Sequence, residues 1–269
     1  MQTPKISVVM SVYNCAPYLA KAIESILGQT CGDFEFIIID DGSTDGSSPM
    51  VDGYAARDAR IRVVHQENRG TIAAANLGLE LAQAELIARM DGDDVADPAR
   101  FERQVAFLDA HEDVGALGTW IWIIDAQDSA RLPSANPATD PSIIAESLRH
   151  SSPIMNPTAM MRKSVAERVG RYRPAYRHCE DYDYWLRFSE LAKLANLPER
   201  LLRYRHYGGQ VSQKHATAQL VGTVIAYAAH QERVAGRRDP TEGLTEMRCL
   251  DELRHMFGRD DLPRLAREF

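Results

Sequence analysis

The sequence ISVVMSV at residues 6–12 is an apolar run that leads directly into polar residues. Such a run, rich in β-branched side chains, predicts a buried strand. FEFIII at residues 34–39 predicts a second strand. Between Pro17 and Gly28, Leu, Ala and Ile recur at helical spacing, and these two end residues are typical of helix boundaries. The chain therefore begins with a strand–helix–strand unit.

The same alternation continues, with strands predicted over residues 61–64 and 86–90 and a helix over 71–82. This pattern favours an α/β fold with a doubly wound, mostly parallel sheet. The pattern of the second half is mixed. It predicts a helix from Pro98, apolar runs over 114–117 and 120–124, a surface loop over 129–141, a helix over 142–149, a loop over 150–157, a short strand over 158–161, a helix over 181–191, and only helices beyond about His215.

Polar residues follow three of the predicted strands at the point where each strand ends. They are Tyr13-Asn14, Asp40-Asp41 and Asp91-Gly92-Asp93-Asp94. In a parallel sheet of this kind, ligands bind beyond the carboxyl ends of the strands. We therefore expect a functional site along this edge.

Asp91 and Asp93 are the best metal-ligand candidates. Grouped carboxylates are costly unless a cation joins them, and Mg²⁺ or Mn²⁺ typically uses one or two carboxylates together with substrate phosphates. A polar turn that caps the helix from Pro98 would explain Asp97 and Asp94, but it does not readily explain the other two. The D-x-D-D pattern alone is a weak signal, because it occurs by chance in many proteins.

The turn DDGSTDG at residues 40–46 is a second acidic cluster. Gly42 permits a positive φ or a close backbone approach, while Ser43, Thr44 or Asp45 can cap the next helix. Asp41 lies directly at the strand end. It is therefore better placed to accept a hydrogen bond from the N–H of a pyrimidine base.

EDYDYW at residues 180–185 begins a predicted helix. Acids in a first turn complement the helix dipole, and this explanation is as good as a functional one for Asp183. A carboxylate held there is also ionised at neutral pH and can accept a proton. Asp181 is our choice of general base for an attacking hydroxyl group. We assign Glu180 and Trp185 to the binding of the acceptor molecule that carries this hydroxyl.

RYRH at residues 203–206 follows a short predicted strand at Leu201-Leu202. His206 could bind the metal or donate a hydrogen bond to a departing diphosphate, and the two arginines could do the latter. A lone histidine is more often structural, so the residues alone leave these alternatives open.

Composition excludes several classes of protein. The 269 residues, 45% hydrophobic and 26% charged, are typical of a globular protein with one large domain, with or without an appendage. The net charge of −7 argues against nucleic-acid binding. We find no transmembrane stretch or signal peptide, and the four scattered cysteines fit reduced thiols, so we expect a cytoplasmic location. The G-x-G-x-x-G, Walker and G-x-S-x-G motifs are absent, which excludes the common dinucleotide, P-loop and serine-hydrolase classes.

In their order along the chain, these motifs resemble the family 2 glycosyltransferases, which have the GT-A fold. The resemblance runs from Pro4 to about Ser212. It rests on residues 6–14, 40–45, 67–70 (ENRG), 89–94 (RMDGDD), 156–162 (NPTAMMR), 180–187 (EDYDYWLR) and 204–206 (YRH). Each motif alone is moderate support, whereas their common order is strong support.

The resemblance implies a non-processive enzyme that transfers one sugar, with inversion, from a UDP-sugar or a related donor to an acceptor hydroxyl. It assigns Ser11, Tyr13 and Asp41 to the base, Asp91 and Asp93 to Mn²⁺ or Mg²⁺ with Asp93 as principal ligand, Asp181 to general base catalysis, and His206 and Ser212 to a loop that closes over the diphosphate. The implied acceptor is a glycan or a lipid-linked glycan, in the synthesis of cell-surface polysaccharide or glycoconjugate.

Two departures from the family pattern matter. Ala75 precedes Asn76 where many members have a basic residue, and Arg69 is the candidate substitute for donor binding. The Q-x-x-R-W motif and membrane helices of processive members are missing. We expect a catalytic domain over residues 1–212 and a helical extension over 213–269. Because the chain from Arg200 onward has 12 Lys/Arg and 9 Asp/Glu, the extension could contact the inner face of a membrane, pair two subunits in a homodimer, or shape the acceptor site.

Two alternatives remain from the residues. A nucleotidyltransferase that makes nucleotide sugars would also use carboxylates and a metal, but it normally has a Gly-rich basic loop after the first strand, where this chain has YNCAP at residues 13–17. A non-catalytic nucleotide-sugar-binding protein would not need Asp91, Asp93 and Asp181 together.

Overall fold

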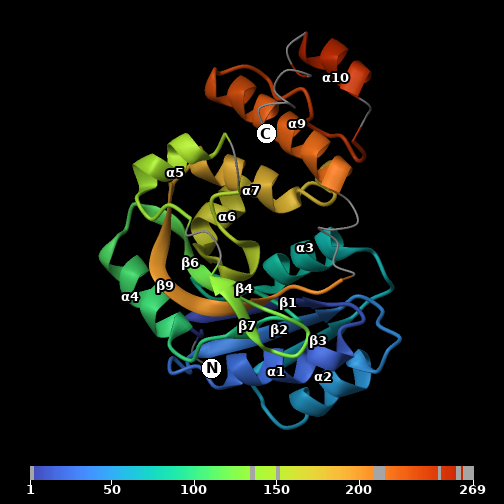
Figure 1. The fold of residues 1–269 in the computed structure, drawn as a ribbon, viewed down its shortest axis with the longest axis vertical. Helices are drawn as coiled ribbons and strands as arrows, with labels where there is room; N and C mark the ends of the chain where they lie inside the picture. Colours follow the sequence, from blue (N-terminus) through green and yellow to red (C-terminus); the bar gives the residue numbers. More distant parts are fainter. Residues whose placement is uncertain are drawn as a thin grey trace.

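Figure 1 shows the computed structural model, which describes residues 3–133, 137–149, 152–208, 216–247, 250–258 and 262. Its strands are β1 (Ile6–Val12), β2 (Phe34–Asp40), β3 (Ile61–His65), β4 (Leu86–Asp91), β5 (Val95–Ala96), β6 (Val114–Ile124), β7 (Ala130–Pro133), β8 (Met160–Arg162) and β9 (Lys193–Arg205). Its helices are α1 (Ala16–Leu27), α2 (Ser47–Ala55), α3 (Thr71–Leu81), α4 (Arg100–Ala110), α5 (Pro141–Ser147), α6 (Lys163–Val169), α7 (Glu180–Ser189), α9 (Ala216–Val234) and α10 (Leu250–Phe257), with 3₁₀ turns η1 (Asn156–Thr158) and η2 (Pro174–Tyr176).

One sheet runs through the molecule in the order β3-β2-β1-β4-β8-β6-β9-β5, and β7 pairs with β6. Strands β3, β2, β1 and β4 are parallel, as the alternation predicts. β8, which follows the turn η1, then joins β4 antiparallel. The α/β class is therefore confirmed, and the parallel order holds for the first half of a sheet that is mixed overall.

One prediction about the second half is wrong, and two apolar runs that were not assigned to an element belong to one strand. The runs 114–117 and 120–124 form one strand, β6, whose pairing with β9 shifts register between Thr119 and Ile121 without breaking. The predicted surface loop over 129–141 contains β7, because its residues pair with Trp122 and Ile124 of β6. A bulge and a short edge strand leave little hydrophobic periodicity in the sequence.

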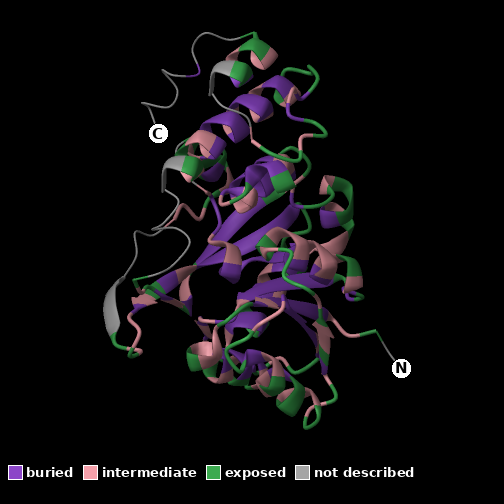
Figure 2. Cartoon of the chain, turned by 90° about the vertical axis from the view of Figure 1, so that its right-hand side faces the viewer, coloured by how far each residue is buried: buried purple, intermediate pink, exposed green. Residues whose placement is uncertain are grey.

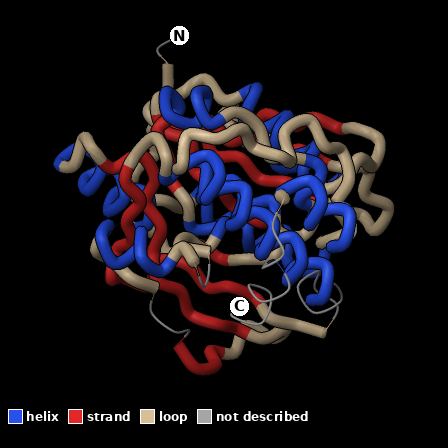
Figure 3. The backbone as a smooth tube through the Cα atoms, turned by 90° about the horizontal axis from the view of Figure 1, so that it is seen from above, coloured by secondary structure: helices blue, strands red, loops and turns tan. Residues whose placement is uncertain are grey.

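The side chains of β1 alternate between two apolar cores. Ile6, Val8 and Met10 pack with α1, α2 and α4, whereas Val9 points to the opposite face, where α3, α6 and α7 lie. Figure 2 shows the buried strands between these helical layers, and Figure 3 shows the helices that cover the sheet as seen from above. The period of two along a strand thus determines which polar side chains face α3 and α7.

The C-terminal part is helical, as expected. α9 packs on α7 and buries Val224, Ile225 and Ala228 completely. The predicted domain boundary at residues 212–213 lies outside the described residues. Among the helices that the structure describes, none has the length and hydropathy needed to cross a bilayer.

Buried Gln104 of α4 connects helix and sheet below the edge where the site is predicted. Its Nε2 donates to the carbonyls of Leu117 (3.1 Å) and Thr158 (2.8 Å), and its Oε1 accepts from Arg100 Nε (3.1 Å). Gln104→Leu would leave these groups buried without partners, so we expect a loss of roughly 2–4 kcal/mol in the free energy of unfolding. Urea denaturation measures it. Arg103→Ala, on the exposed side of the same helix, should change stability by less than about 0.5 kcal/mol, and equal losses in both variants would contradict the prediction.

Candidate functional site

Ser11 and Asp91 lie side by side at the carboxyl ends of β1 and β4. They are register partners in the parallel pair, so both side chains project toward the face covered by α3 and α7. The Ser11 Oγ is buried and has no hydrogen-bond partner among the residues that the structure describes. Tyr13, just beyond the strand, keeps 53% of its surface exposed. The edge predicted from the sequence thus presents an unpaired hydroxyl and an open aromatic ring beside a carboxylate.

Asp93 follows Asp91 across a tight turn that lies against α1. A Cβ on Gly92 would come within 2.8 Å of Cys15 Sγ, so a side chain there would displace the turn. Tyr207 donates its hydroxyl hydrogen to Asp93 Oδ2 (3.2 Å). Burial, together with the negative charge of Asp91, raises the pKa of Asp93 to about 6. Burial also raises the pKa of Asp91, and Arg89 and Arg100 oppose that shift.

Arginines behind the strand ends balance part of this negative charge. Arg89 is buried and its Nη2 lies 3.7 Å from Asp91. Arg100 is fully buried, donates to the Arg89 carbonyl (2.8 Å), and has its pKa lowered by burial to about 9. Arg205 is also fully buried, where its Nε donates to the Asp93 carbonyl (2.7 Å). The suggestion that Arg205 contacts a diphosphate is therefore wrong, because its guanidinium is committed to holding the turn.

Glu180 and Asp181 form the first turn of α7, on the same face of the sheet as Asp91. Burial raises the pKa of Glu180 to about 7, and the charges of Asp181 and Asp91 contribute to that shift. Burial and the charge of Asp91 likewise raise the pKa of Asp181, against the hydrogen bond from the Tyr182 N–H (2.8 Å). One Glu180 oxygen, Oε2, is buried and has no hydrogen-bond partner in the described part of the chain. The structure therefore brings the two predicted acidic motifs into one negatively charged site.

Asp94 and Asp97 have structural roles. Asp94 is buried and accepts from the Arg205 backbone N–H (2.8 Å), so it ties the turn after β4 to β9 and does not cap a helix. Asp97 accepts from the Ala99 N–H (3.0 Å) just before α4. Because α4 begins at Arg100 with Ala99 as its N-cap residue and no side-chain cap, the capping explanation for Asp97 is wrong. Asp91 and Asp93 are therefore the remaining candidates for metal ligands in this cluster.

A hard divalent cation fits Asp91 and Asp93, because both are partly exposed carboxylates in an excess of negative charge. Within the described ranges, no three His, Cys, Asp or Glu side chains come close enough together to enclose a metal ion. Two carboxylate ligands would leave the remaining coordination positions of the metal ion to phosphates and water, an arrangement that is common for Mg²⁺. His206 is exposed, and its backbone N–H donates to the Ile124 carbonyl (2.8 Å). This bond does not involve the imidazole ring, so the role of His206 as a metal ligand stays a prediction.

The second acidic turn lies beside the loop that precedes α3. Asp41 is buried and accepts from Gln66 Nε2 (2.5 Å) and from the backbone N–H groups of Arg69 (2.9 Å) and Gly70 (2.8 Å). Gly42 has φ +76°, and a Cβ on it would lie 2.9 Å from the Asn68 nitrogen, which confirms both reasons given for a glycine there. The contact of Asp41 with a base stays a prediction, since one lone-pair position on its Oδ2 remains available.

The Arg69 side chain is exposed, and its backbone N–H donates a hydrogen bond to Asp41. The predicted contact of Arg69 with the nucleotide-sugar donor also stays a prediction. Asn76 binds the backbone of Tyr172 through both of its side-chain atoms (2.8 and 2.9 Å). Trp185 is completely buried among Tyr184 and Phe188, so the prediction that its ring contacts an acceptor is wrong: helical periodicity turns it into the core. Ser212 lies outside the described residues.

Two tyrosines of the site were not predicted. Tyr204 is half-buried and packs against the core that includes Met10 and Phe101. Burial and the charges of Asp94, Asp91, Asp93 and Asp181 raise the pKa of its phenol. Tyr207 bonds Asp93, and its ring lies 5.2 Å from that of Tyr18. The only signal in the sequence was their position beside His206, because the pairing of β9 with β5 that brings them to the site is long-range.

The raised pKa of Asp93 predicts that the metal-free protein loses stability as pH rises. Between the unfolded value of 3.8 and the folded value of about 6, the folded state binds more protons than the unfolded state, so the free energy of unfolding falls across this window. Asp93→Asn should remove roughly 1–3 kcal/mol of that fall. Thermal melts in EDTA from pH 4 to pH 8 measure it, and parallel curves for both proteins would contradict the assignment.

The family model and the relatives that match this chain are all described as glycosyltransferases. Residues 7–170 match the family described as glycosyl transferase family 2. The putative glycosyltransferase EpsE of Bacillus subtilis is 36% identical over 234 residues, which cover 84% of this chain and 82% of that protein. An uncharacterized glycosyltransferase of Haemophilus influenzae is 34% identical over 218 residues, with coverages of 78% and 68%.

Solved structures with the same fold include enzymes in complex with nucleotide sugars. S. aureus TarS in complex with UDP-GlcNAc has a TM-score of 0.68 at 18% identity, and the match covers 97% of this chain and 81% of that chain. The mannosyltransferase PcManGT from Pyrobaculum calidifontis, in complex with GDP-Man and Mn²⁺, has a TM-score of 0.60 at 17% identity, with coverages of 100% and 74%. At such identities the likeness shows the fold alone.

Proposed function

The chain belongs to glycosyltransferase family 2 and has a GT-A fold, and from this premise we propose that it transfers one sugar from a UDP-sugar to an acceptor hydroxyl with inversion. The observation that carries this proposal is the meeting of two acidic motifs from distant parts of the chain. Asp91 and Asp93 end β4, Glu180 and Asp181 begin α7, and the charge of Asp91 acts on both of the latter.

The donor base is held by Ser11, Tyr13 and Asp41 in this proposal. The exposed Tyr13 ring offers a stacking surface, and the unpaired Ser11 Oγ offers a hydrogen bond. Asp41, kept in place by backbone N–H groups, accepts the N–H of the base. The TarS complexes with UDP and UDP-GlcNAc support a uridine nucleotide.

Asp93, assisted by Asp91, holds Mn²⁺ or Mg²⁺ against the donor diphosphate. A cation bound there supplies positive charge that stabilises the departing diphosphate. The raised pKa of Asp93 supports this assignment, because burial and then the charge of Asp91 make its ionised form costly, and a cation would offset both effects. The Mn²⁺ in the PcManGT complex supports it as well. His206 and Ser212 are proposed to approach the diphosphate after donor binding.

Asp181 acts as the general base. The acceptor oxygen forms a bond to the anomeric carbon while its hydroxyl proton passes to Asp181. The bond from that carbon to the diphosphate oxygen breaks, and its electron pair leaves with the nucleoside diphosphate. Glu180, with its unpaired Oε2, orients the acceptor hydroxyl.

The acceptor is proposed to be a glycan or lipid-linked glycan of cell-surface polysaccharide or glycoconjugate synthesis, extended by one sugar at a time in the cytoplasm. The unpaired thiols of Cys15, Cys31 and Cys179 agree with a reducing compartment. Peripheral membrane contact and homodimer formation are the two partner roles proposed for the helical extension over residues 213–269.

Incubation with Mn²⁺ and a panel of nucleotide sugars tests the proposal. Slow release of free nucleoside diphosphate from one donor is the expected result. Turnover of pyrophosphate with a sugar phosphate would instead indicate a nucleotidyltransferase, and the absence of any turnover with tight donor binding would indicate a non-catalytic binding protein.

Asp181→Asn should keep the affinity for UDP-sugar within about twofold and reduce the transfer rate at least about 100-fold, because the base is lost while the donor contacts remain. Calorimetry and steady-state kinetics measure the two quantities. Asp183→Asn is not a suitable control because it breaks buried ion pairs, whereas Asp109→Asn alters only an exposed pair with Lys5. An unchanged rate in Asp181→Asn would remove this residue as the base.

Asp93→Asn should weaken Mn²⁺-dependent binding of UDP by at least about tenfold while leaving the weak metal-free binding unchanged. Titration of UDP with Mn²⁺ or with EDTA separates the two. Equal metal-dependent affinity in the variant and the wild type would show that another residue is the principal ligand.

A further inference from the structure

α9 touches the chain immediately before the first turn of α7. Gln219 donates its side-chain N–H to the His178 carbonyl (2.9 Å), and His178 has a φ of +77°, a conformation that a non-glycine residue adopts at a cost. Three residues along α9, Gly222 lies against Cys179. A Cβ on Gly222 would come within 2.2 Å of the Cys179 Sγ, which is much closer than atoms can approach. Helix α9 therefore packs directly against the residues that precede α7.

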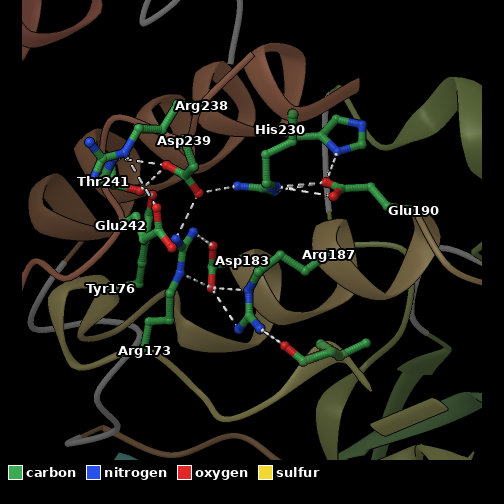
Figure 4. Close-up of polar contacts among 12 residues, drawn as sticks. Arg173, Tyr176, Asp183, Arg187, Glu190, His230, Arg238, Asp239, Thr241 and Glu242 are labelled. Carbon is green, nitrogen blue, oxygen red and sulfur yellow. Dashed lines mark hydrogen bonds and ion pairs between the residues drawn. The ribbon is translucent and has the colours of Figure 1, made fainter. Parts of the chain in front are cut away.

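A buried network of charged side chains joins the same two parts of the molecule (Figure 4). Asp183, in the first turn of α7, has no exposed surface and pairs with Arg173 and Arg187. Arg173 also pairs with Asp239 (2.8 Å), which lies beyond α9 and pairs in turn with Arg233 of α9 (2.6 Å). The pKa of Asp239 is about 2: burial opposes the shift, but hydrogen bonds from Thr241 and Arg173 outweigh it. The carboxylate is therefore ionised at any working pH.

The other end of α7 is held in the same way. Glu190, directly after the helix, pairs with His230 (2.7 Å) and with Arg233 (2.9 Å) of α9. A second polar contact, Tyr176 with Thr241 (2.8 Å), links the approach to α7 with the segment after α9. Contacts from residues 219–241 thus fix α7 at its start and at its end, so this helix cannot slide or rotate independently of α9.

We infer that the segment over residues 219–241 sets the position of Glu180 and Asp181, with Gly222, Arg173 and Asp239 as positioning residues. This inference rests on the proposed function of those two carboxylates. Its basis is that the contacts converge on residues 178, 179 and 183, which flank the two carboxylates on both sides. The C-terminal segment is thereby part of the catalytic unit, in addition to any contact it makes with a membrane or a second subunit.

The close approach of Gly222 to Cys179 allows a steric test with a built-in rescue. Gly222→Ala should push residues 178–181 away from their place and lower kcat for nucleoside diphosphate release from UDP-glucose or UDP-GlcNAc roughly 10- to 100-fold, with the affinity for UDP and Mn²⁺ unchanged. Cys179→Ala removes the colliding sulfur, and the next atom, the Cβ, is 3.6 Å away. The double variant Cys179→Ala/Gly222→Ala should therefore recover the kcat of Cys179→Ala alone.

Asp239→Asn provides a second, independent disturbance, and Arg238→Gln is its matched control. Arg238 forms only a solvent-exposed pair with Glu242 (3.5 Å), next to Asp239 in the chain. We expect Asp239→Asn to lower kcat at least about fivefold with unchanged affinity for UDP and Mn²⁺, and Arg238→Gln to behave as the wild type.

Amide hydrogen exchange over residues 178–184 gives a readout that does not depend on activity. Gly222→Ala should exchange faster there, and the double variant should regain the protection of Cys179→Ala. Wild-type kcat and protection in Gly222→Ala would overturn the inference, as would a parallel loss of kcat, UDP affinity and melting temperature, or failure of the rescue. If the wild-type chain releases no nucleoside diphosphate, the proposed function fails, and the exchange experiment still decides whether α9 positions this turn.

Discussion

The concentration of negative charge at the carboxyl edge of the parallel strands is the constraint around which the rest of the molecule is arranged. The charge of Asp91 acts there on Glu180 and Asp181 in the first turn of α7 and on its neighbour Asp93. Burial makes the ionised forms of Asp91 and Asp93 costly. Arg89 and Arg100 lie behind the strand ends and offset part of that cost without reaching the open side of the site. The negative charge that these arginines do not offset favours the binding of a cation together with a diphosphate at this edge.

Helix α7 must satisfy two opposite requirements within ten residues. One face is part of the apolar core, with Tyr184, Trp185 and Phe188 fully buried, while its first turn carries three acids. One of these three acids, Asp183, is buried and paired with Arg173 and Arg187, so it does not face the edge of the sheet. Breaking a buried pair of this kind typically costs about 3–5 kcal/mol. The apolar core and the ion pairs therefore hold the helix in place. The carboxylates proposed to be functional, Glu180 and Asp181, lie in its first turn, at the edge of the sheet.

Glycines matter at the points where the backbone carries polar groups close to one another. Gly42 brings the turn after β2 against Asn68, which allows N–H groups of the following loop to reach Asp41. Gly92 brings the Asp91–Asp93 turn against α1. At both positions the absence of a Cβ sets the distance between a strand end and its neighbour, and so determines where a carboxylate stands.

Local pattern alone was sufficient for the first four strands, the helices between them and the edge where the site lies, because period-two and period-3.6 repeats report directly on which face is buried. It also predicted Asp91, Asp93 and Asp181 as candidate site residues, although acids at a helix start also complement the helix dipole. The bulged course of β6, the edge strand β7, the burial of Trp185 and the contributions of Tyr204 and Tyr207 depend on pairing between distant segments, whose register leaves no local signal. The hold of α9 on α7 is likewise a property of the tertiary structure, because only packing reveals that Gly222 faces Cys179 and that Asp239 reaches Arg173.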